Sequence, residues 1–300
     1  MILRTKTKIG LARVAQRIIM GGRRATGQGP IALCWRSGLR WKLDLREGID
    51  FSIFIRGSFE PAMVSVYRSM IPSGAIVIDI GANVGAHTLP LAARVGEAGR
   101  VVAVEPTRYA FDRLEEHILL NPTLAARIIP LQAMLMGSRE AVLAEKIESS
   151  WPLDTPSDAH PEHAGVAKAT TGAVVSTLDD VVLDLDLKSV DFVKLDVDGY
   201  EVEVLRGARE TLRRFLPLIF FEHAPYGVAE KGYDPDEIAE ILTGAGYRFT
   251  DLKRRSLPAG AYGLPDIKTG AGINLMALPE AGHQEALRAR RSPAFSRNQR

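Results

Sequence analysis

The sequence predicts an α/β protein built on a mostly parallel β-sheet. Between residues 76 and 245, runs rich in β-branched residues alternate with segments of helical periodicity, which is typical of parallel strands joined by crossover helices. The last two strand-like runs, over 247–253 and 273–278, are expected to form an antiparallel pair that closes the sheet. The strand-like runs also carry acids at their ends, which is where open α/β sheets bind ligands.

Composition fits one large globular core. The 300 residues are 46% hydrophobic and 25% charged, and no apolar run approaches the roughly 20 residues needed to span a bilayer. The single cysteine, Cys34, excludes an internal disulfide and a cysteine metal cluster and fits a reducing compartment. Arg13 and Arg17 interrupt any secretory apolar stretch near the N-terminus. We therefore expect a cytoplasmic protein, with a peripheral position at the inner membrane face as an alternative.

The first 70 residues precede the alternating pattern. Residues 1–22 are expected to form a basic amphipathic helix, because apolar residues recur at helical spacing between cations. Gly21-Gly22 and Gly27-Gln28-Gly29 are expected to end this helix. Residues 31–60 are interpreted as short strands or a lead-in segment, with period-two alternation over 40–45, and 61–70 as a helix.

The core elements then follow in order. Helices are expected over 107–121, closed by Asn121-Pro122, over 201–215, and over 235–245, where Gly244 and Gly246 stop it. Residues 137–172 lose periodicity and are too long for an ordinary connection, so they are interpreted as a lid or a disordered insert. The corresponding strands are expected over 76–80, 100–104, 127–134, 190–196 and 217–222.

The loop after the first of these strands indicates the cofactor. Asp79 ends the strand, and Gly81, Asn83 and Gly85 follow before the next helix. A dinucleotide fingerprint needs three glycines against a pyrophosphate, and here two glycines are four residues apart. This loop favours S-adenosylmethionine, whose cationic amino group can meet Asp79 while the glycines let the backbone approach the ligand.

The next strand supports a nucleoside. It ends in Glu105-Pro106, and an acid in this position is placed to accept hydrogen bonds from both ribose hydroxyls. NAD-binding and S-adenosylmethionine-binding proteins share that feature. An NAD(P)-dependent oxidoreductase is therefore the alternative, and the glycine spacing decides against it.

Several longer motifs carry a resemblance to a known family: VIDIGANVGAHT (77–88), VVAVEPTRYAFDRLEEHILLN (101–121), STLDD (176–180), FVKLDVDGYEVEVLRGA (192–208) and LIFFE (218–222), with EGID (47–50) and GSFEP (57–61) upstream. Together they resemble the FkbM family of S-adenosylmethionine-dependent methyltransferases. The resemblance runs from about residue 44 to 279 and implies a Rossmann-like class I methyltransferase fold: a mostly parallel seven-stranded sheet with helices on both faces and an antiparallel closing strand. It also implies methyl transfer, frequently to hydroxyls of sugars or natural products. Family members more often carry Glu at the position of Asp198.

With this resemblance, the chain divides into three parts. A basic N-terminal extension spans 1–43, a methyltransferase domain spans 44–280 with the insert or lid at 137–172, and a basic tail expected to be disordered spans 281–300.

Methyl transfer to oxygen needs a group that takes the acceptor's proton. Asp196 is a candidate for this base or for orienting the acceptor, with capping of the next helix as its structural alternative. Glu201 could serve likewise or act as a capping acid. His223 has an unperturbed pKa near 6.5, suited to a general base, with a packing role as its alternative. His87 beside the glycine loop is interpreted as structural.

More specialised chemistries are not supported. The Asn-Pro-Pro-aromatic motif of amino-methylating enzymes has only a near match at Asn121-Pro-Thr-Leu, and Cys34 lies outside the core motifs, which disfavours a cysteine nucleophile. The acids Asp196, Asp198 and Glu222 could cluster, but their spacing demands no metal, so no metal site is predicted. N-methylation stays an alternative to O-methylation, and the oligomeric state cannot be predicted.

The basic N-terminus supports a non-enzymatic alternative. Ten Lys or Arg precede the first acid, Asp44, which would suit a polyanion. No nucleic-acid motif accompanies them, so no nucleic-acid partner is expected. Weak membrane contact through residues 1–22 is the more plausible form, and packing of this helix on the protein's own core is the alternative.

Overall fold

The structure is a computed structural model that describes residues 5–154, 159–160, 165–257, 264–265, 267 and 272–280, with side chains described from Gly10 onward. The predicted basic tail, 281–300, lies outside the described residues. So do residues 155–158 and 161–164 of the predicted insert.

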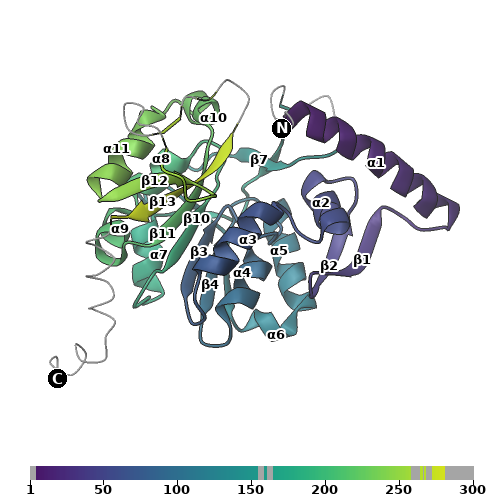
Figure 1. Cartoon of the computed structure of the whole chain (residues 1–300), viewed down its shortest axis with the longest axis horizontal. Helices are drawn as coiled ribbons and strands as arrows, with labels where there is room; N and C mark the ends of the chain where they lie inside the picture. The colour runs from purple at the N-terminus through teal and green to yellow at the C-terminus, as the bar shows by residue number, and fades with distance from the viewer. Residues whose placement is uncertain are drawn as a thin grey trace. The chain divides into compact units, whose positions relative to one another are not determined.

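A seven-stranded, mostly parallel sheet is the centre of the fold, as the sequence predicts (Figure 1). The strand order is β12-β13-β11-β10-β3-β4-β5, and the direction of chain progression reverses beside β3. Parallel pairs join β10 to β3, β10 to β11 and β4 to β5, whereas β13 runs antiparallel to both β11 and β12. The predicted antiparallel closing pair is confirmed. The strands are β3 (Ile76–Ile80), β4 (Arg100–Val104), β5 (Ile128–Leu131), β10 (Phe192–Leu195), β11 (Leu218–His223), β12 (Tyr247–Asp251) and β13 (Ile273–Pro279).

The described residues group into two compact units. The first comprises residues up to Gly74 together with Gly81–Met134 and Leu143–Val174. The second comprises Ala75–Ile80, Leu135–Val142 and the residues from Val175 onward. The boundaries expected from the sequence, at 43/44 and 280, stay predictions.

The first unit begins with a long helix and a hairpin. The helix α1 (Thr5–Ala25) buries Gln16 and Met20, and it is followed by the antiparallel strands β1 (Ile31–Arg36) and β2 (Leu39–Asp44). Period two along β2 buries Leu39, Trp41 and Leu43 on one face. Among the described residues, none of the helices has the length and apolar character required to cross a membrane.

Residues 45–60 differ from the sequence expectation, because they contain the helix α2 (Gly48–Arg56) in place of further strands. Its second turn points inward and buries Phe51 and Ile53, and it ends at Gly57, whose φ of 81° is the left-handed conformation common at helix ends. The predicted helix over 61–70 is present as α3 (Pro61–Met70).

The predicted insert contains structure that the sequence pattern does not indicate. Strand β7 (Lys146–Ser150) pairs antiparallel with β8 (Val166–Ala169), with a register shift between Glu148 and Ser150. The irregular pairing explains why no period-two pattern predicted it. Outside the insert, the remaining elements up to residue 176 are α4 (Thr88–Val95), α5 (Arg108–Leu120), α6 (Pro122–Ala125), β6 (Ala133–Leu135) and β9 (Val174–Ser176).

In the second unit, the single helix expected over 201–215 is two helices that break at Gly207. A Cβ atom placed on Gly207 would lie 2.2 Å from the carbonyl oxygen of Met136, so the chain approaches that backbone more closely than any side chain allows. The helices of this unit are α7 (Leu178–Asp184), α8 (Glu201–Arg206), α9 (Arg209–Phe215), α10 (Pro225–Glu230) and α11 (Asp236–Gly244).

Replacing Gly207 tests this close approach. Gly207→Ala is expected to lower the free energy of unfolding by about 1–3 kcal/mol, because the new methyl group must displace backbone. The matched control is Gly244→Ala at the end of α11, where the methyl group would meet open space. Chemical denaturation measures both, and equal effects of the two substitutions would contradict the packing explanation.

Candidate active site

The glycine loop of the first unit is a tight turn fixed to the end of β4. The backbone N–H groups of Gly81 and Ala82 both donate to the carbonyl oxygen of Val104, each at 3.0 Å. Gly85 has a φ of 86°, and a Cβ atom there would lie 2.9 Å from Leu114 Cδ1 on α5. The loop therefore requires glycine at 85 both for its backbone conformation and for its packing.

The carboxylate of Glu105 is buried beside this loop, at the end of β4. Its Oε2 accepts a hydrogen bond from the backbone N–H of Asn83 at 2.9 Å. Its Oε1 accepts from the backbone N–H of Thr107 at 2.9 Å and from the Thr107 hydroxyl at 2.6 Å. These uncharged donors fix the orientation of the carboxylate and join it directly to the glycine loop. Pro106, the other predicted residue of this strand end, is also buried.

Ser149 of the insert completes the network, and sequence reasoning missed it. Its hydroxyl lies 2.7 Å from the Thr107 hydroxyl, and its backbone carbonyl accepts from Asn83 Nδ2 at 3.1 Å. Asn83 itself has a φ of 48°, a left-handed conformation that asparagine tolerates better than most residues. Since β7 lies in a segment without periodicity, no sequence signal identified Ser149.

In the second unit, a buried lysine lies between two of the predicted acids. Lys194 faces Asp79 across the parallel pair of β10 and β3, and its Nζ is 3.6 Å from Asp79 Oδ1. The same Nζ is 3.0 Å from Asp196 Oδ2. A buried cation is stable only when it is paired, so these three residues form one electrostatic group. A lysine within the otherwise apolar strand Phe-Val-Lys-Leu is the sequence signal that could have identified it.

The pairing with Lys194 limits the chemical roles that Asp79 and Asp196 can have. A proton moved onto Asp196 would break its ion pair with Lys194, so Asp196 is better suited to orienting a ligand than to accepting a proton. A cationic ligand at Asp79 would have to share that carboxylate with the lysine ammonium.

The loop after β10 holds Glu201 through a strained backbone. Asp198 and Gly199 have φ values of 50° and 100°, and a Cβ atom on Gly199 would lie 2.4 Å from the carbonyl oxygen of Gly227. Glu201 is buried and accepts a hydrogen bond from the N–H of Val197 at 3.1 Å. The pKa of Glu201 is raised to about 7, mainly because the carboxyl is buried; backbone hydrogen bonds oppose this rise and the nearby charge of Asp196 adds to it. A carboxyl with this pKa can exchange a proton near neutral pH.

His223 is buried at the end of β11. Its Nε2 lies 3.1 Å from the carbonyl oxygen of Pro265 and must donate to it, since the carbonyl only accepts. Burial lowers the pKa of the imidazole. The neutral ring therefore carries its proton on Nε2, and Nδ1, which has no hydrogen-bond partner among the described residues, holds a lone pair.

His87 packs against protein side chains, in keeping with the structural role expected from the sequence. The Phe59 and Tyr67 rings meet the buried imidazole edge-on, and its Nε2 lies 3.4 Å from Glu60 Oε2. In the part of the chain that the structure describes, no three His, Cys, Asp or Glu side chains are grouped to hold a metal.

Comparison with known proteins identifies the family. Residues 79–249, more than half of the chain, match the model of the FkbM methyltransferase domain, and the chain belongs to this family. The matched domain is a methyltransferase domain. A solved structure of methyltransferase FkbM from Methylobacillus flagellatus superposes on 73% of this chain and 48% of its own, with 16% identity and a TM-score of 0.44.

Two curated relatives are similar to part of the chain. The hexuronic acid methyltransferase AglP from Haloferax volcanii is 26% identical over 170 residues, which is 57% of this chain. The methyltransferase sdnD from Sordaria araneosa is 27% identical over 165 residues, which is 47% of this chain. In each case the match spans 62% of the relative's length.

Removing the charge of Lys194 tests its role in the acidic group. Lys194→Met is expected to lower the free energy of unfolding by roughly 3–5 kcal/mol, because Asp79 and Asp196 lose a buried counter-charge. Lys188→Met is the control, since Lys188 pairs with Asp186 on the exposed surface, where ion pairs contribute little. A Lys194→Met protein as stable as the control would contradict the pairing.

Glu201 makes stability depend on pH in a defined direction. Its carboxyl has a pKa of about 7 when folded against 4.5 for an unperturbed group, so the folded state binds the proton more tightly. This stabilisation is complete below pH 4.5 and is lost as pH rises to about 7. Between pH 4.5 and 7.5 the unfolding free energy of the wild type should therefore fall by about 3 kcal/mol relative to that of Glu201→Gln, which has no carboxyl at this position. Urea titrations at each pH measure this, and a constant difference would contradict the shift.

Proposed function

We propose that the protein methylates a hydroxyl group of a sugar, glycan or other natural product. The observation that carries the proposal is the Glu105 carboxylate, buried at the end of β4 and bonded to the glycine loop in a domain of the FkbM methyltransferase family. Bound S-adenosylmethionine supplies an electrophilic methyl group on its sulfonium sulfur. The chain must then bind the nucleoside, position the acceptor and accept its proton.

Glu105 is the proposed partner of the ribose hydroxyls. A carboxylate accepts hydrogen bonds and hydroxyls donate them, and the bonds from Asn83 and Thr107 fix the carboxylate in advance of binding. Gly81 and Gly85 carry no side chains, so the backbone at these two positions can approach the ligand. Asp79, in the second unit, is the proposed partner of the ligand's amino group, and its carboxylate also pairs with the ammonium of Lys194.

His223 is the favoured proton acceptor in this proposal. Its neutral ring holds a lone pair on Nδ1, and Nε2 is oriented by the Pro265 carbonyl. Glu201 is the second candidate, because a pKa of about 7 suits proton transfer near neutral pH. Asp196, paired with Lys194, is assigned to orienting the acceptor.

The proposed class of acceptor rests on one relative and on side chains of the loop after β10. AglP is a hexuronic acid methyltransferase, so an acidic sugar is the first acceptor to test. Tyr200 offers a half-buried ring next to Gly199, with Lys231 Nζ 5.4 Å from the ring centroid. The Lys231 ammonium lies over this ring, and a cation there suits a carboxylate, which favours a uronic acid over a neutral sugar.

A methyl-donor assay on a panel of uronic acids, neutral sugars, polyphenols and amines tests the proposal. We expect turnover with a hydroxyl acceptor, and His223→Ala should lower kcat by about 10²–10⁴ at saturating donor while the affinity for S-adenosylhomocysteine is unchanged. Turnover restricted to amines would replace O-methylation by N-methylation. Binding of NADH with no binding of S-adenosylhomocysteine would favour an oxidoreductase. Unchanged kcat in both His223→Ala and Glu201→Gln would overturn the proton-acceptor assignment.

Ser149 gives a second test, on the cofactor side. Ser149→Ala removes the hydroxyl that contacts Thr107, so the affinity for S-adenosylhomocysteine should fall by about 0.5–1.5 kcal/mol, the usual contribution of one hydrogen bond. Ser138→Ala, on an exposed residue near the start of the same insert, is the control and should bind as the wild type does. Isothermal titration calorimetry measures both. Identical affinities for all three proteins would exclude the insert from cofactor binding.

A further inference from the structure

The helix α1 carries an apolar stripe that faces away from the protein. Leu11, Val14 and Ile18 are 59%, 56% and 71% exposed, and their spacing of three and four residues places them on one side of the helix. Gln16 and Met20, on another side, are buried. Only the side of α1 that carries Gln16 and Met20 packs on the protein's own core, and the apolar stripe on the other side stays exposed.

Hydrogen bonds hold α1 in this orientation. Arg13 Nε donates to the carbonyl oxygen of Leu153 at 2.8 Å. Near the end of the helix, Arg23 donates to the carbonyl oxygens of Gly29 and Ile31 at 2.9 and 3.0 Å. With these two arginines engaged with the protein's own backbone, the exposed stripe points in a fixed direction.

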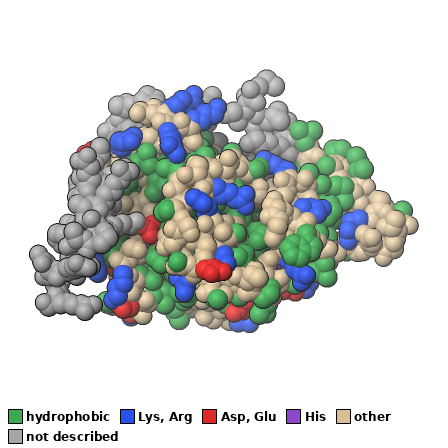
Figure 2. Space-filling model, turned by 60° about the horizontal axis from the view of Figure 1, so that its bottom comes forward, with side chains coloured by type: hydrophobic (Ala, Val, Ile, Leu, Met, Phe, Trp, Pro, Cys, Tyr) green, Lys and Arg blue, Asp and Glu red, His purple; other side chains and the backbone are tan. Residues whose placement is uncertain are grey.

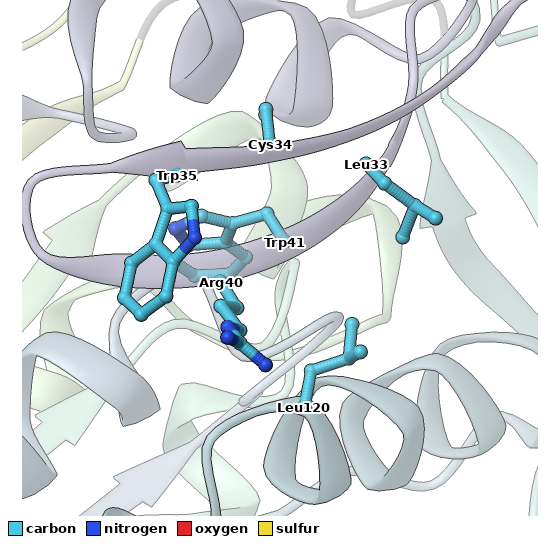
Figure 3. A pocket seen from close by; sticks show the side chains of 6 residues that line it. All are labelled: Leu33, Cys34, Trp35, Arg40, Trp41 and Leu120. Atoms are coloured by element: carbon cyan, nitrogen blue, oxygen red, sulfur yellow. The ribbon is translucent and has the colours of Figure 1, made fainter.

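The following hairpin has a second exposed apolar surface. On the outer face of β1, Leu33 and Trp35 are 73% and 59% exposed, and Arg40 lies opposite Trp35 with its guanidinium carbon 4.7 Å from the ring centroid (Figure 3). An exposed tryptophan beside an arginine is typical of the interfacial region of a bilayer. A pocket of about 260 Å³ opens here, lined by Leu33, Cys34, Trp35, Arg40, Trp41 and Leu120.

Charge around these surfaces is one-sided. Ten Lys or Arg precede the first acid of the chain, Asp44. Arg17 and Arg24 are exposed on α1 and make no ion pair with other described residues. Figure 2 shows hydrophobic and basic side chains interspersed over the end of the molecule where α1 and the hairpin lie.

We propose that α1 and the outer face of the β1–β2 hairpin dock the protein on a bilayer surface that contains anionic lipid. Exposed aliphatic side chains would enter the boundary between headgroups and acyl chains, and the arginines would meet lipid phosphates. Neither insertion of apolar side chains nor attraction to phosphates alone gives firm attachment, and here both kinds of side chain occur on α1 and the hairpin that follows it.

The same observations disfavour other occupants. Nucleic acid offers nothing to cover the Leu11, Val14 and Ile18 stripe, although it would attract the cations. A second copy of this chain could cover the stripe, but a symmetric contact would bring like-charged arginines together. The bilayer surface supplies both the apolar phase and the negative charge, and this proposal is independent of the methyl acceptor.

Vesicle co-sedimentation of the full chain tests the proposal. The probe is a set of phosphatidylcholine vesicles with and without 30% phosphatidylglycerol, at low and high salt. We expect pelleting with the anionic vesicles, at least tenfold weaker with pure phosphatidylcholine and reduced by salt. Ile18→Glu and the pair Arg17→Glu with Arg24→Glu should each weaken binding about tenfold or more. The matched control is Leu183→Glu on α7, where the leucine is 74% exposed and far from the N-terminus in sequence.

Three results would overturn it. Wild-type protein that stays in the supernatant with anionic vesicles at low salt excludes docking. Equal losses in Ile18→Glu and Leu183→Glu exclude the α1 stripe. A wild-type dimer by light scattering that Ile18→Glu converts to monomer, with vesicle binding unchanged, assigns the surface to a contact between copies.

Discussion

The hydrogen bonds accepted by the Glu105 carboxylate hold the glycine loop and the start of α5 at the end of β4. One oxygen is bonded to the loop through Asn83 and the other to the start of α5 through Thr107. Thr107 also caps α5 and contacts Ser149, so the strand end, the loop, the helix and the insert share one polar network. A buried carboxylate is costly unless such donors surround it, and the same donors leave it oriented for a ligand.

The second unit contains several acids close together and compensates their charges in two ways. Asp79 and Asp196 lie at the ends of β3 and β10, and the buried Glu201 begins α8; ionised carboxylates at these places would repel one another in a low-dielectric environment. The ammonium of Lys194 compensates the charges of Asp79 and Asp196. Glu201 accepts backbone hydrogen bonds, and its raised pKa reduces its charge near neutral pH. The unit therefore separates carboxylates that stay paired from one that can gain or lose a proton near neutral pH. Such a difference between neighbouring acids is a recurrent property of catalytic sites.

Much of the fold and part of the candidate site could be predicted from the sequence. The buried parallel strands and the glycine loop have strong local signals, so Asp79, Gly85 and Glu105 were identifiable from spacing alone. The helix α2, the hairpin of the insert and the break at Gly207 were not, because tertiary contacts decide them: Gly207 is required by the backbone of Met136, 71 residues away in sequence. Ser149 and the pairing of Lys194 with Asp79 were missed for the same reason, since each contact joins residues that are distant along the chain.

The central claim is that Glu105 holds the ribose of the methyl donor. The most direct test compares S-adenosylhomocysteine with its 2′-deoxy analogue by calorimetry, on the wild type and on Glu105→Gln. Loss of the hydroxyl should cost the wild type about 1.5–3 kcal/mol of binding free energy, the range for hydrogen bonds to charged groups, and should cost Glu105→Gln clearly less. An equal cost in both proteins would show that Glu105 does not contact the ribose and would contradict this account.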